Sequence, residues 1–215
     1  LRELFQLPYR QTEGLARSLV ELMEIPLDIP DYTSLAKRAA KLEISLDVRR
    51  HSGPIDVVVD STGLKVFGEG EWKMRKHGKS KRRTWRKLHL AINADTQEIE
   101  AEILTENSCD DASQVAPLLD QVSGSTHAFY GDGAYDKWKV YEILEKRRTK
   151  AMIPPQRNAK ISQHSNSRRG PQPRDVAIRE IHRRGRSHWK ERVGYHRRSL
   201  AETAMHRMKS TFGDH

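Results

Sequence analysis

Apolar residues follow a helical period at the start of the chain and a strand period further on. Over residues 1–47 leucines recur at near-helical spacing, with a break at Pro26–Pro30. Asp31 or Thr33 can cap a second, basic helix over residues 34–42. We therefore expect a small N-terminal helical region, residues 1–50. Two short helices with a basic second one suit part of a DNA-binding helix-turn-helix, and a purely structural helical appendage explains the pattern equally well.

From residue 55 onward the pattern is that of an α/β fold with a mixed sheet. The β-branched run 55–60 predicts a buried strand that ends at Asp60. Residues 88–93 and 98–104 alternate on either side of a four-residue turn, which predicts a hairpin. Further elements are expected at residues 110–122 (helix), 126–131 (strand), 136–148 (helix) and 151–154 (strand). This order differs from the strict strand–helix alternation of a doubly wound sheet.

The stretch 195–209 predicts an amphipathic helix with an unusual polar face. At 100° per residue, one arc of roughly 80° holds five polar residues: Tyr195, Arg198, Glu202, His206 and Lys209. The other side is apolar and would face the core: Leu200, Ala204, Met205, Met208 and Phe212. The simplest interpretation is a solvated face with an ordinary i,i+4 ion pair between Arg198 and Glu202. The alternative is a carboxylate presented to a site together with two cations.

Two aspartates are expected where apolar strands end. Asp60 is followed by Ser-Thr-Gly-Leu and then Lys65, and Asp132 lies in Tyr-Gly-Asp-Gly-Ala-Tyr-Asp. A carboxylate at the carboxyl end of a strand points into the crevice where α/β sheets bind ligands. Either aspartate alone is more often a turn or cap residue. Together with Glu202, at separations of 72 and 70 residues, they predict a site of three carboxylates.

These residues resemble the motifs of the DDE transposases of bacterial insertion sequences. The spacing of Tyr195, Arg198, Glu202 and Lys209 is similar to that family's Y-x2-R-x3-E-x6-K signature, without a departure. The family's first motif is an aspartate after an apolar strand, and its second is a strand-terminal Asp-Gly-Ala-Tyr-Asp. The resemblance runs from about Asp60 to Lys209, some two-thirds of the chain. It implies a ribonuclease H-like fold, with a mixed sheet flanked by helices, over a catalytic domain of residues 51–215.

The resemblance also implies a metal-dependent reaction on DNA. Asp60, Asp132 and Glu202 would bind two Mg²⁺ ions, with Mn²⁺ able to substitute, and Asp60 would bridge them. Hard oxygen ligands suit both metals, and two ions about 4 Å apart can activate an attacking oxygen and stabilise a leaving one. The implied steps are cleavage at the ends of the protein's own element and transfer of the freed 3′-hydroxyl into target DNA. A homodimer on paired ends, with Arg198 and Lys209 near phosphate, is implied as well.

Charge independently favours a polyanionic partner. Lys and Arg number 39 against 29 Asp and Glu, a formal net charge of +10, which favours DNA through phosphate neutralisation. The sequence lacks both a basic amphipathic helix with a large apolar face and an apolar run near the roughly 18–20 residues of a membrane span. Cys109 is the single cysteine, so an internal disulfide and a thiolate zinc cluster are excluded. Without a signal peptide, we expect a bacterial cytoplasmic, nucleoid-associated protein.

Two basic segments flank the predicted site. Residues 73–87 hold nine Lys or Arg and no acid, with Trp72 and Trp85 available for stacking on bases. Residues 156–198 hold thirteen Lys or Arg against three acids, and their Pro-, Gly- and Ser-rich beginning suggests a mobile basic insertion at about 156–194. Charge runs are usually solvated surface, but beside three carboxylates phosphate contact is favoured. The candidate DNA contacts are Arg198, Lys209, Tyr195, Lys65, Trp85, Arg86 and Lys87.

The remaining polar residues near these motifs are expected to be structural. Asp110 or Asp111 would cap the helix at 110–122, and Asp136 would cap the helix that follows it. Glu191 falls in the linker, outside the polar stripe. His89 shares a strand face with the neighbouring alanine and is left out of the catalytic set. Tyr195 either positions a DNA strand or packs at the start of its helix.

Two rival functions remain open at this stage. In the first, a truncated or decayed transposase binds DNA without catalysis and acts as a repressor, with the carboxylates serving as caps. In the second, a ribonuclease H-like nuclease cleaves but has no transfer step. The chain begins at Leu1 without an initiator methionine and stops at His215, so we expect a fragment.

Overall fold

The computed structural model describes residues 1–42, 51–66, 85–162 and 170–213. These fall into two compact units. One comprises Leu1–Asp47 with Arg207–Asp214, and the other comprises Val48–His206 with His215. No helix within the described ranges combines the length and the apolar character needed to cross a membrane.

The first unit contains three helices, α1 (Arg2–Phe5), α2 (Tyr9–Leu22) and α3 (Tyr32–Ala40). A carboxylate oxygen of Glu13 accepts a hydrogen bond of 2.7 Å from the Tyr32 amide, which ties α2 to the start of α3. Asp31 is the N-cap of α3 and accepts hydrogen bonds from the amides of Thr33 and Ser34. The cap is therefore Asp31 and not Thr33. Leu4 and Leu22, two of the leucines that predicted this region, remain exposed.

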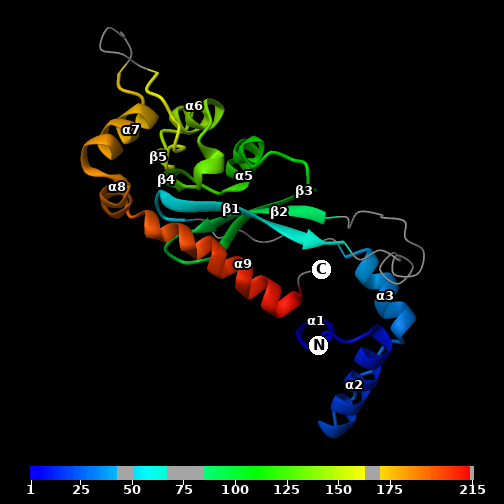
Figure 1. Cartoon of the computed structure of the whole chain (residues 1–215). Coiled ribbons are helices and arrows are strands. Elements are labelled where there is room, and N and C mark those ends of the chain that lie inside the picture. The colour runs from blue at the N-terminus through cyan, green and yellow to red at the C-terminus, as the bar shows by residue number, and fades with distance from the viewer. Residues whose placement is uncertain (43–50, 67–84, 163–169, 214–215) are drawn as a thin grey trace, which may run out of the picture. The chain divides into compact units, whose positions relative to one another are not determined.

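The second unit is built on a five-stranded mixed sheet in the order β3-β2-β1-β4-β5 (Figure 1). The strands are β1 (Ile55–Lys65), β2 (Trp85–Asn93), β3 (Ile99–Glu106), β4 (Thr126–Tyr130) and β5 (Lys150–Met152). β1, β2 and β3 pair antiparallel, whereas β4 runs parallel to both β1 and β5. The predicted hairpin is thus confirmed. The α/β architecture, a mixed sheet flanked by helices, is consistent with a ribonuclease H-like fold.

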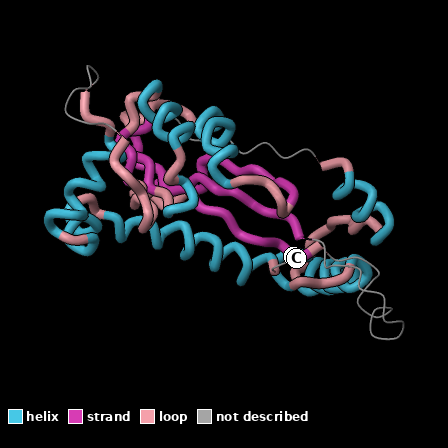
Figure 2. The backbone as a smooth tube through the Cα atoms, turned by 45° about the horizontal axis from the view of Figure 1, so that its top comes forward, coloured by secondary structure: helices cyan, strands magenta, loops and turns pink. Residues whose placement is uncertain are grey.

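Helices cover both faces of this sheet (Figures 1 and 2). α5 (Val115–Gln121), preceded by the 3-10 turn η1 (Asp111–Gln114), and α6 (Trp138–Lys146) lie over one face. α9 (Ser199–Phe212), preceded by the 3-10 turn η3 (Tyr195–Arg198), runs along the other. Strand alternation explains this burial, because Val57 and Val59 belong to the core under α5 and α6 while Val58, buried just as fully, points to the opposite face.

The segment after β5 is helical where the structure describes it, forming α7 (Pro173–Arg184) and α8 (Arg186–Arg192). Glu191 therefore lies in α8. The Arg174 side chain of α7 makes a two-pronged ion pair with the buried carboxylate of Asp136, at 2.7 and 3.2 Å. Asp136 also accepts hydrogen bonds from the Tyr141 hydroxyl and the Gln156 amide. The prediction that Asp136 caps the next helix is wrong, because buried donors from three segments use its oxygens.

Candidate active site

The register of the sheet places Asp60 and Asp132 at the same level on neighbouring strands. Val58 of β1 lies beside Tyr130 of β4, and each aspartate follows two residues later on its own chain segment. The expectation that the strand ends at Asp60 is wrong, since β1 continues to Lys65 in antiparallel pairing with β2. What ends just before Asp60 is the pairing with β4. Asp60 therefore lies on a continuous strand, beside the point where its neighbour stops.

Asp132 is held in place by the turn that follows it. Its carboxylate accepts a hydrogen bond of 2.8 Å from the Ala134 amide and so caps the 3-10 turn η2 (Gly133–Tyr135). Immediately before it, Gly131 lets the Tyr135 ring approach the backbone. A β-carbon at Gly131 would lie 2.8 Å from Cδ2 of Tyr135. The glycine of this motif therefore serves the close packing of Tyr135 against the strand end.

Arg198 joins the third carboxylate to the first. Its guanidinium donates to Asp60 at 2.9 Å and to Glu202 at 2.6 Å, bridging β1 and α9. The i,i+4 pair expected of an ordinary helix surface is therefore present, but the same guanidinium is also bound to a strand carboxylate. The Asp60 side chain is 14% exposed and that of Glu202 58% exposed. A largely buried and a largely open carboxylate thus share one cation.

The charges of Asp132 and Glu202 both act on the Asp60 carboxylate. Burial raises the pKa of Asp60, the Ser61 amide and Arg198 lower it, and the charges of Asp132 and Glu202 raise it further, leaving a net increase. Burial acts to lower the pKa of Arg198, but the charges around it, Asp60 first, outweigh burial and raise it. The cluster therefore favours a cation beside Asp60.

The donor set suits a hard divalent cation. Carboxylate oxygens are the ligands that Mg²⁺ and Mn²⁺ prefer, and Arg198 marks a position between Asp60 and Glu202 where positive charge is favoured. Within the described ranges no three His, Cys, Asp or Glu residues already stand at metal-ligand spacing. Binding an ion between Asp60 and Glu202 therefore requires the Arg198 guanidinium to move aside.

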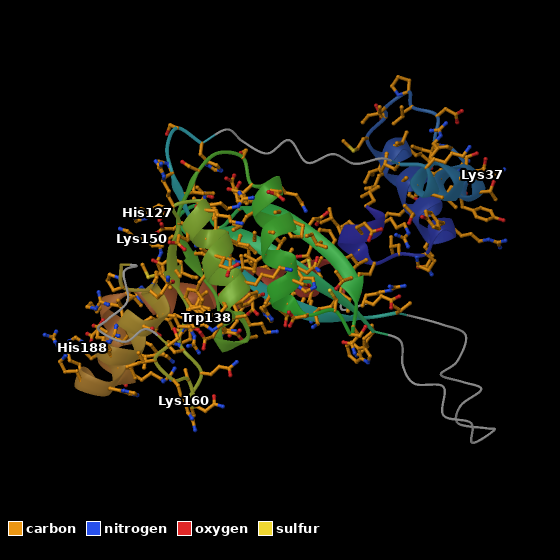
Figure 3. All side chains as sticks on the ribbon, turned by 90° about the horizontal axis from the view of Figure 1, so that it is seen from above. Lys37, His127, Trp138, Lys150, Lys160 and His188 are labelled. Atoms are coloured by element: carbon orange, nitrogen blue, oxygen red, sulfur yellow. The ribbon has the colours of Figure 1, made fainter. Side chains whose placement is uncertain are left out.

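The neighbouring Arg197 fixes the turn that carries Arg198. It forms ion pairs with Asp56 of β1 and with Asp95, and its guanidinium lies 5.7 Å from the centroid of the Tyr130 ring. Asp56 also pairs with His127 at 2.8 Å. The His127 ring in turn lies 3.1 Å from the Lys150 ammonium, and Figure 3 shows these two side chains side by side. Arg197 thus anchors η3 to β1 and to the turn after β2 through groups outside the carboxylate cluster.

The tyrosine of the C-terminal motif packs at the start of its helix. The Tyr195 ring lies 6.1 Å from that of Trp189, and the Lys190 ammonium lies 5.2 Å from its centroid. Burial raises the pKa of Tyr195 to about 12; the charge of Arg198 opposes this increase, and those of Asp132 and Asp60 add to it. Its hydroxyl therefore stays protonated and lies within the field of the cluster.

The other candidate DNA contacts are only partly free for that role. Lys65 lies 5.9 Å from the Trp85 ring, and Arg86 pairs with Glu106 at 3.1 Å. Lys87 donates to the Cys109 carbonyl at 2.8 Å, so its ammonium is used inside the fold. Lys209 is half-buried on α9. Most of the basic segment 73–87 lies outside the described residues, as does Trp72 just before it.

The structure also gathers polar groups that the sequence interpretation set aside. Asp110 occupies the N-cap of η1 without a side-chain cap hydrogen bond and pairs with Lys137 instead. Asp111 lies 3.3 Å from the Lys87 ammonium and 3.4 Å from Nδ1 of the fully buried His89. The cap interpretation is wrong for both aspartates. Lys87 and His89, which face Asp111, alternate along β2. The spacing of residues within that strand does not show which later turn will lie opposite them.

The apolar face predicted for α9 is partly buried. Ala204 and Met205 are buried, Leu200 and Met208 are half-buried, and Phe212 is exposed. The polar stripe holds for Arg198 and Glu202, whose side chains form an ion pair. The helical pattern therefore identified the buried side of the helix, although its last apolar position does not pack.

Comparison with known protein families is consistent with this geometry. Residues 51–215 match a family model described as a transposase DDE domain. Residues 1–69 match a second model that carries the same description. The first match spans well over half of the chain and includes the whole sheet, all three carboxylates and Arg198. The chain therefore belongs to the DDE transposase family.

Proposed function

We propose that this transposase cleaves DNA at the ends of its own element and transfers the freed 3′-hydroxyl into target DNA, with Asp60, Asp132 and Glu202 as the metal-binding carboxylates. The observation that carries the proposal is the Arg198 bridge between Asp60 and Glu202, beside an Asp132 that the sheet register places level with Asp60. This arrangement collects three negative charges around one position that favours a cation.

The chain's own residues supply the geometry of the reaction. When bound, two Mg²⁺ or Mn²⁺ ions would activate the attacking oxygen and stabilise the leaving one. Asp60 on β1 and Asp132 in the turn just after β4 would form one side of the site, and Glu202 would complete it from α9. Arg198, once released from the carboxylates, would bind the phosphate beside the cut, because a guanidinium matches phosphate oxygens in a two-pronged contact. Lys209, Tyr195, Lys65, Trp85, Arg86 and Lys87 are the further proposed DNA contacts.

The wider assembly follows the same proposal. Residues 51–215 would form the catalytic domain and residues 1–50 a helical DNA-binding appendage. Two copies acting on paired element ends, in the bacterial cytoplasm at the nucleoid, would carry out both steps. The basic stretch at about 156–194 would track DNA phosphates outside the carboxylate site.

Substitution of one carboxylate tests the proposal. Asp132→Asn should reduce metal-dependent nicking of element-end DNA on the order of a thousandfold, because removing one member of a catalytic group disables the group as a whole. DNA binding should stay within about twofold of wild type, since Asn keeps the cap to Ala134 and removes a charge that repels phosphate. Asp120→Asn, at an exposed position that pairs with Arg147, is the matched control and should leave both measurements unchanged. Equal loss of binding and nicking in Asp132→Asn would contradict the catalytic assignment.

A non-catalytic DNA-binding role is the second candidate, and the same Arg198 bridge supports it. A guanidinium that permanently neutralises Asp60 and Glu202 would leave a basic protein that binds DNA without cutting. Wild-type DNA binding without metal-dependent nicking would favour this repressor role. Nicking without joining of a 3′-hydroxyl end to target DNA would instead indicate a nuclease that lacks the transfer step.

A further inference from the structure

Tyr135 carries a buried hydroxyl that no established interaction explains. The side chain is 1% exposed, and its ring packs edge-to-face on Phe129 with the centroids 5.8 Å apart. Its hydroxyl has no hydrogen-bond partner within the part of the chain that the structure describes. A phenylalanine would fill the same space without burying a polar group, so packing does not account for the oxygen.

The position of that hydroxyl is set by the same short motif that carries Asp132. Tyr135 ends the turn that Asp132 caps, and the bare backbone of Gly131 lets its ring lie against the strand end. η2 packs against η1, which brings Asp111 to the same region. Burial and then the charges of Asp111, Asp60 and Asp132 raise the pKa of Tyr135 well above its ordinary value. The group is therefore a permanent donor that lies within the field of three acceptors.

Asp111 is also incompletely satisfied. Its buried oxygen Oδ1 makes no hydrogen bond among the described residues, although the Lys87 ammonium lies 3.3 Å away. His89 does not supply the missing donor when it is neutral. The Thr105 hydroxyl donates to the carbonyls of Lys87 and Glu106, so it accepts from Nε2 of His89 and leaves Nδ1 as an acceptor facing Asp111. Asp111 therefore faces Lys87 and His89, and the Tyr135 hydroxyl makes no hydrogen bond to it.

We infer that Tyr135 is a positioning residue of the carboxylate site, whose hydroxyl donates a hydrogen bond to one of the carboxylates Asp60 and Asp132 when they bind their cations. The inference rests on the proposed function and deepens it. A carboxylate that binds a metal through one oxygen needs a donor on its other oxygen to hold its orientation, and such supporting donors change metal affinity or activity by tenfold or more. Arg198 can supply that donor only while it occupies the position proposed for the cation, so a different donor is needed once the cation binds.

Two buried tyrosines provide a matched experiment. Tyr135→Phe removes the hydroxyl without a partner, whereas Tyr141→Phe removes one that donates to buried Asp136 at 3.1 Å, on the far side of the turn. Both substitutions delete a single oxygen from a largely buried ring. The two full-length variants and wild type would be compared for thermal unfolding without metal, for Mn²⁺ binding by electron paramagnetic resonance, and for kcat and KM of DNA nicking.

For Tyr135→Phe we expect an unfolding midpoint equal to or above that of wild type, about tenfold weaker Mn²⁺ binding and a reduced kcat with unchanged KM. For Tyr141→Phe we expect a lower midpoint with wild-type Mn²⁺ affinity. Unchanged Mn²⁺ binding and kcat in Tyr135→Phe would overturn this inference and leave the proposed function standing. The same holds if Mn²⁺ binding and kcat fall no more than the fraction of unfolded Tyr135→Phe protein accounts for. Failure of wild type to bind Mn²⁺ or to nick DNA would overturn the proposed function and this inference with it.

Discussion

At the scale of single residues, Arg198 is the cation that the carboxylates Asp60 and Glu202 already hold. Its guanidinium bridges the two, so on the proposed function a metal ion would have to compete with a cation that is part of the chain. That competition would set a threshold for the metal concentration at which the site fills. It would also link metal binding to the release of a guanidinium that can then bind phosphate.

Replacing Arg198 should expose this competition. Arg198→Gln keeps donor groups but removes the charge, so without metal we expect a loss of about 1–2 kcal/mol in the free energy of unfolding, because both partners of this ion pair are partly exposed. Mn²⁺ should then raise the unfolding midpoint of the variant more than that of wild type, since no guanidinium has to be displaced. Thermal unfolding over a Mn²⁺ titration measures both effects. Equal midpoint shifts in the two proteins would show that Arg198 does not compete with the metal.

Local sequence patterns were enough to propose residues for the candidate site, but they did not show the partners of those residues. Asp60, Asp132 and Glu202 could be selected because each lies in a recognisable local setting, two after apolar strands and one on the polar stripe of a helix. The contact of Arg198 with Asp60 joins residues 138 positions apart, and a local sequence pattern cannot predict a contact between residues so far apart in the chain. The contacts of Asp111 with Lys87 and His89 were not predicted for the same reason.

At the scale of elements, the buried contact between Asp136 and Arg174 ties the helix after the basic stretch to the turn beside the site. The Asp136 side chain is fully buried and that of Arg174 is 12% exposed. The backbone carbonyl of Lys160 also accepts a hydrogen bond from Arg174, at 3.1 Å. One arginine therefore connects α7, the preceding loop and the segment that follows Asp132.

Removal of this arginine should destabilise the fold strongly. Arg174→Met leaves the Asp136 carboxylate buried without its cation, and we expect a loss of about 3 kcal/mol in the free energy of unfolding. The double variant Asp136→Asn with Arg174→Met removes both charges and should recover part of that loss. Urea unfolding of the three proteins gives the comparison. A double variant that is less stable than Arg174→Met would show that the charge pair is not the main contribution of this contact.

Element types were predictable here and element ends were not. Alternation identified the hairpin, whose two strands pair antiparallel, whereas β4 is a short run buried on both faces. β1 continues five residues past its apolar run because β2 pairs with Ser61–Lys65, and a partner strand is invisible to local pattern. Likewise the helix expected at 110–122 begins as a 3-10 turn, and α6 starts two residues after Asp136.

At the scale of the whole molecule, the net charge of +10 should make DNA binding depend steeply on salt. Several arginines of residues 156–198 are paired with carboxylates, among them Arg174, Arg192 and Arg197, so fewer than thirteen can neutralise phosphate. With about six phosphate contacts, the dissociation constant should rise roughly a thousandfold between 50 and 200 mM salt. Fluorescence anisotropy with labelled duplex measures the slope, which should be the same for Asp132→Asn. A dissociation constant that hardly changes with salt would contradict binding by the basic segments.

The adjacency of Arg197 and Arg198 has a mechanical consequence. Arg197 forms ion pairs with Asp56 on β1 and with Asp95 in the turn after β2. The position of the backbone here therefore does not depend on the ion pair between Arg198 and Asp60. Arg198 can therefore swivel about its own side-chain torsions while the helix start stays where it is. On the proposed function, binding of a metal ion would then cost the rearrangement of one side chain and not the movement of a helix, and the backbone of Glu202, one turn further along, would stay where it is.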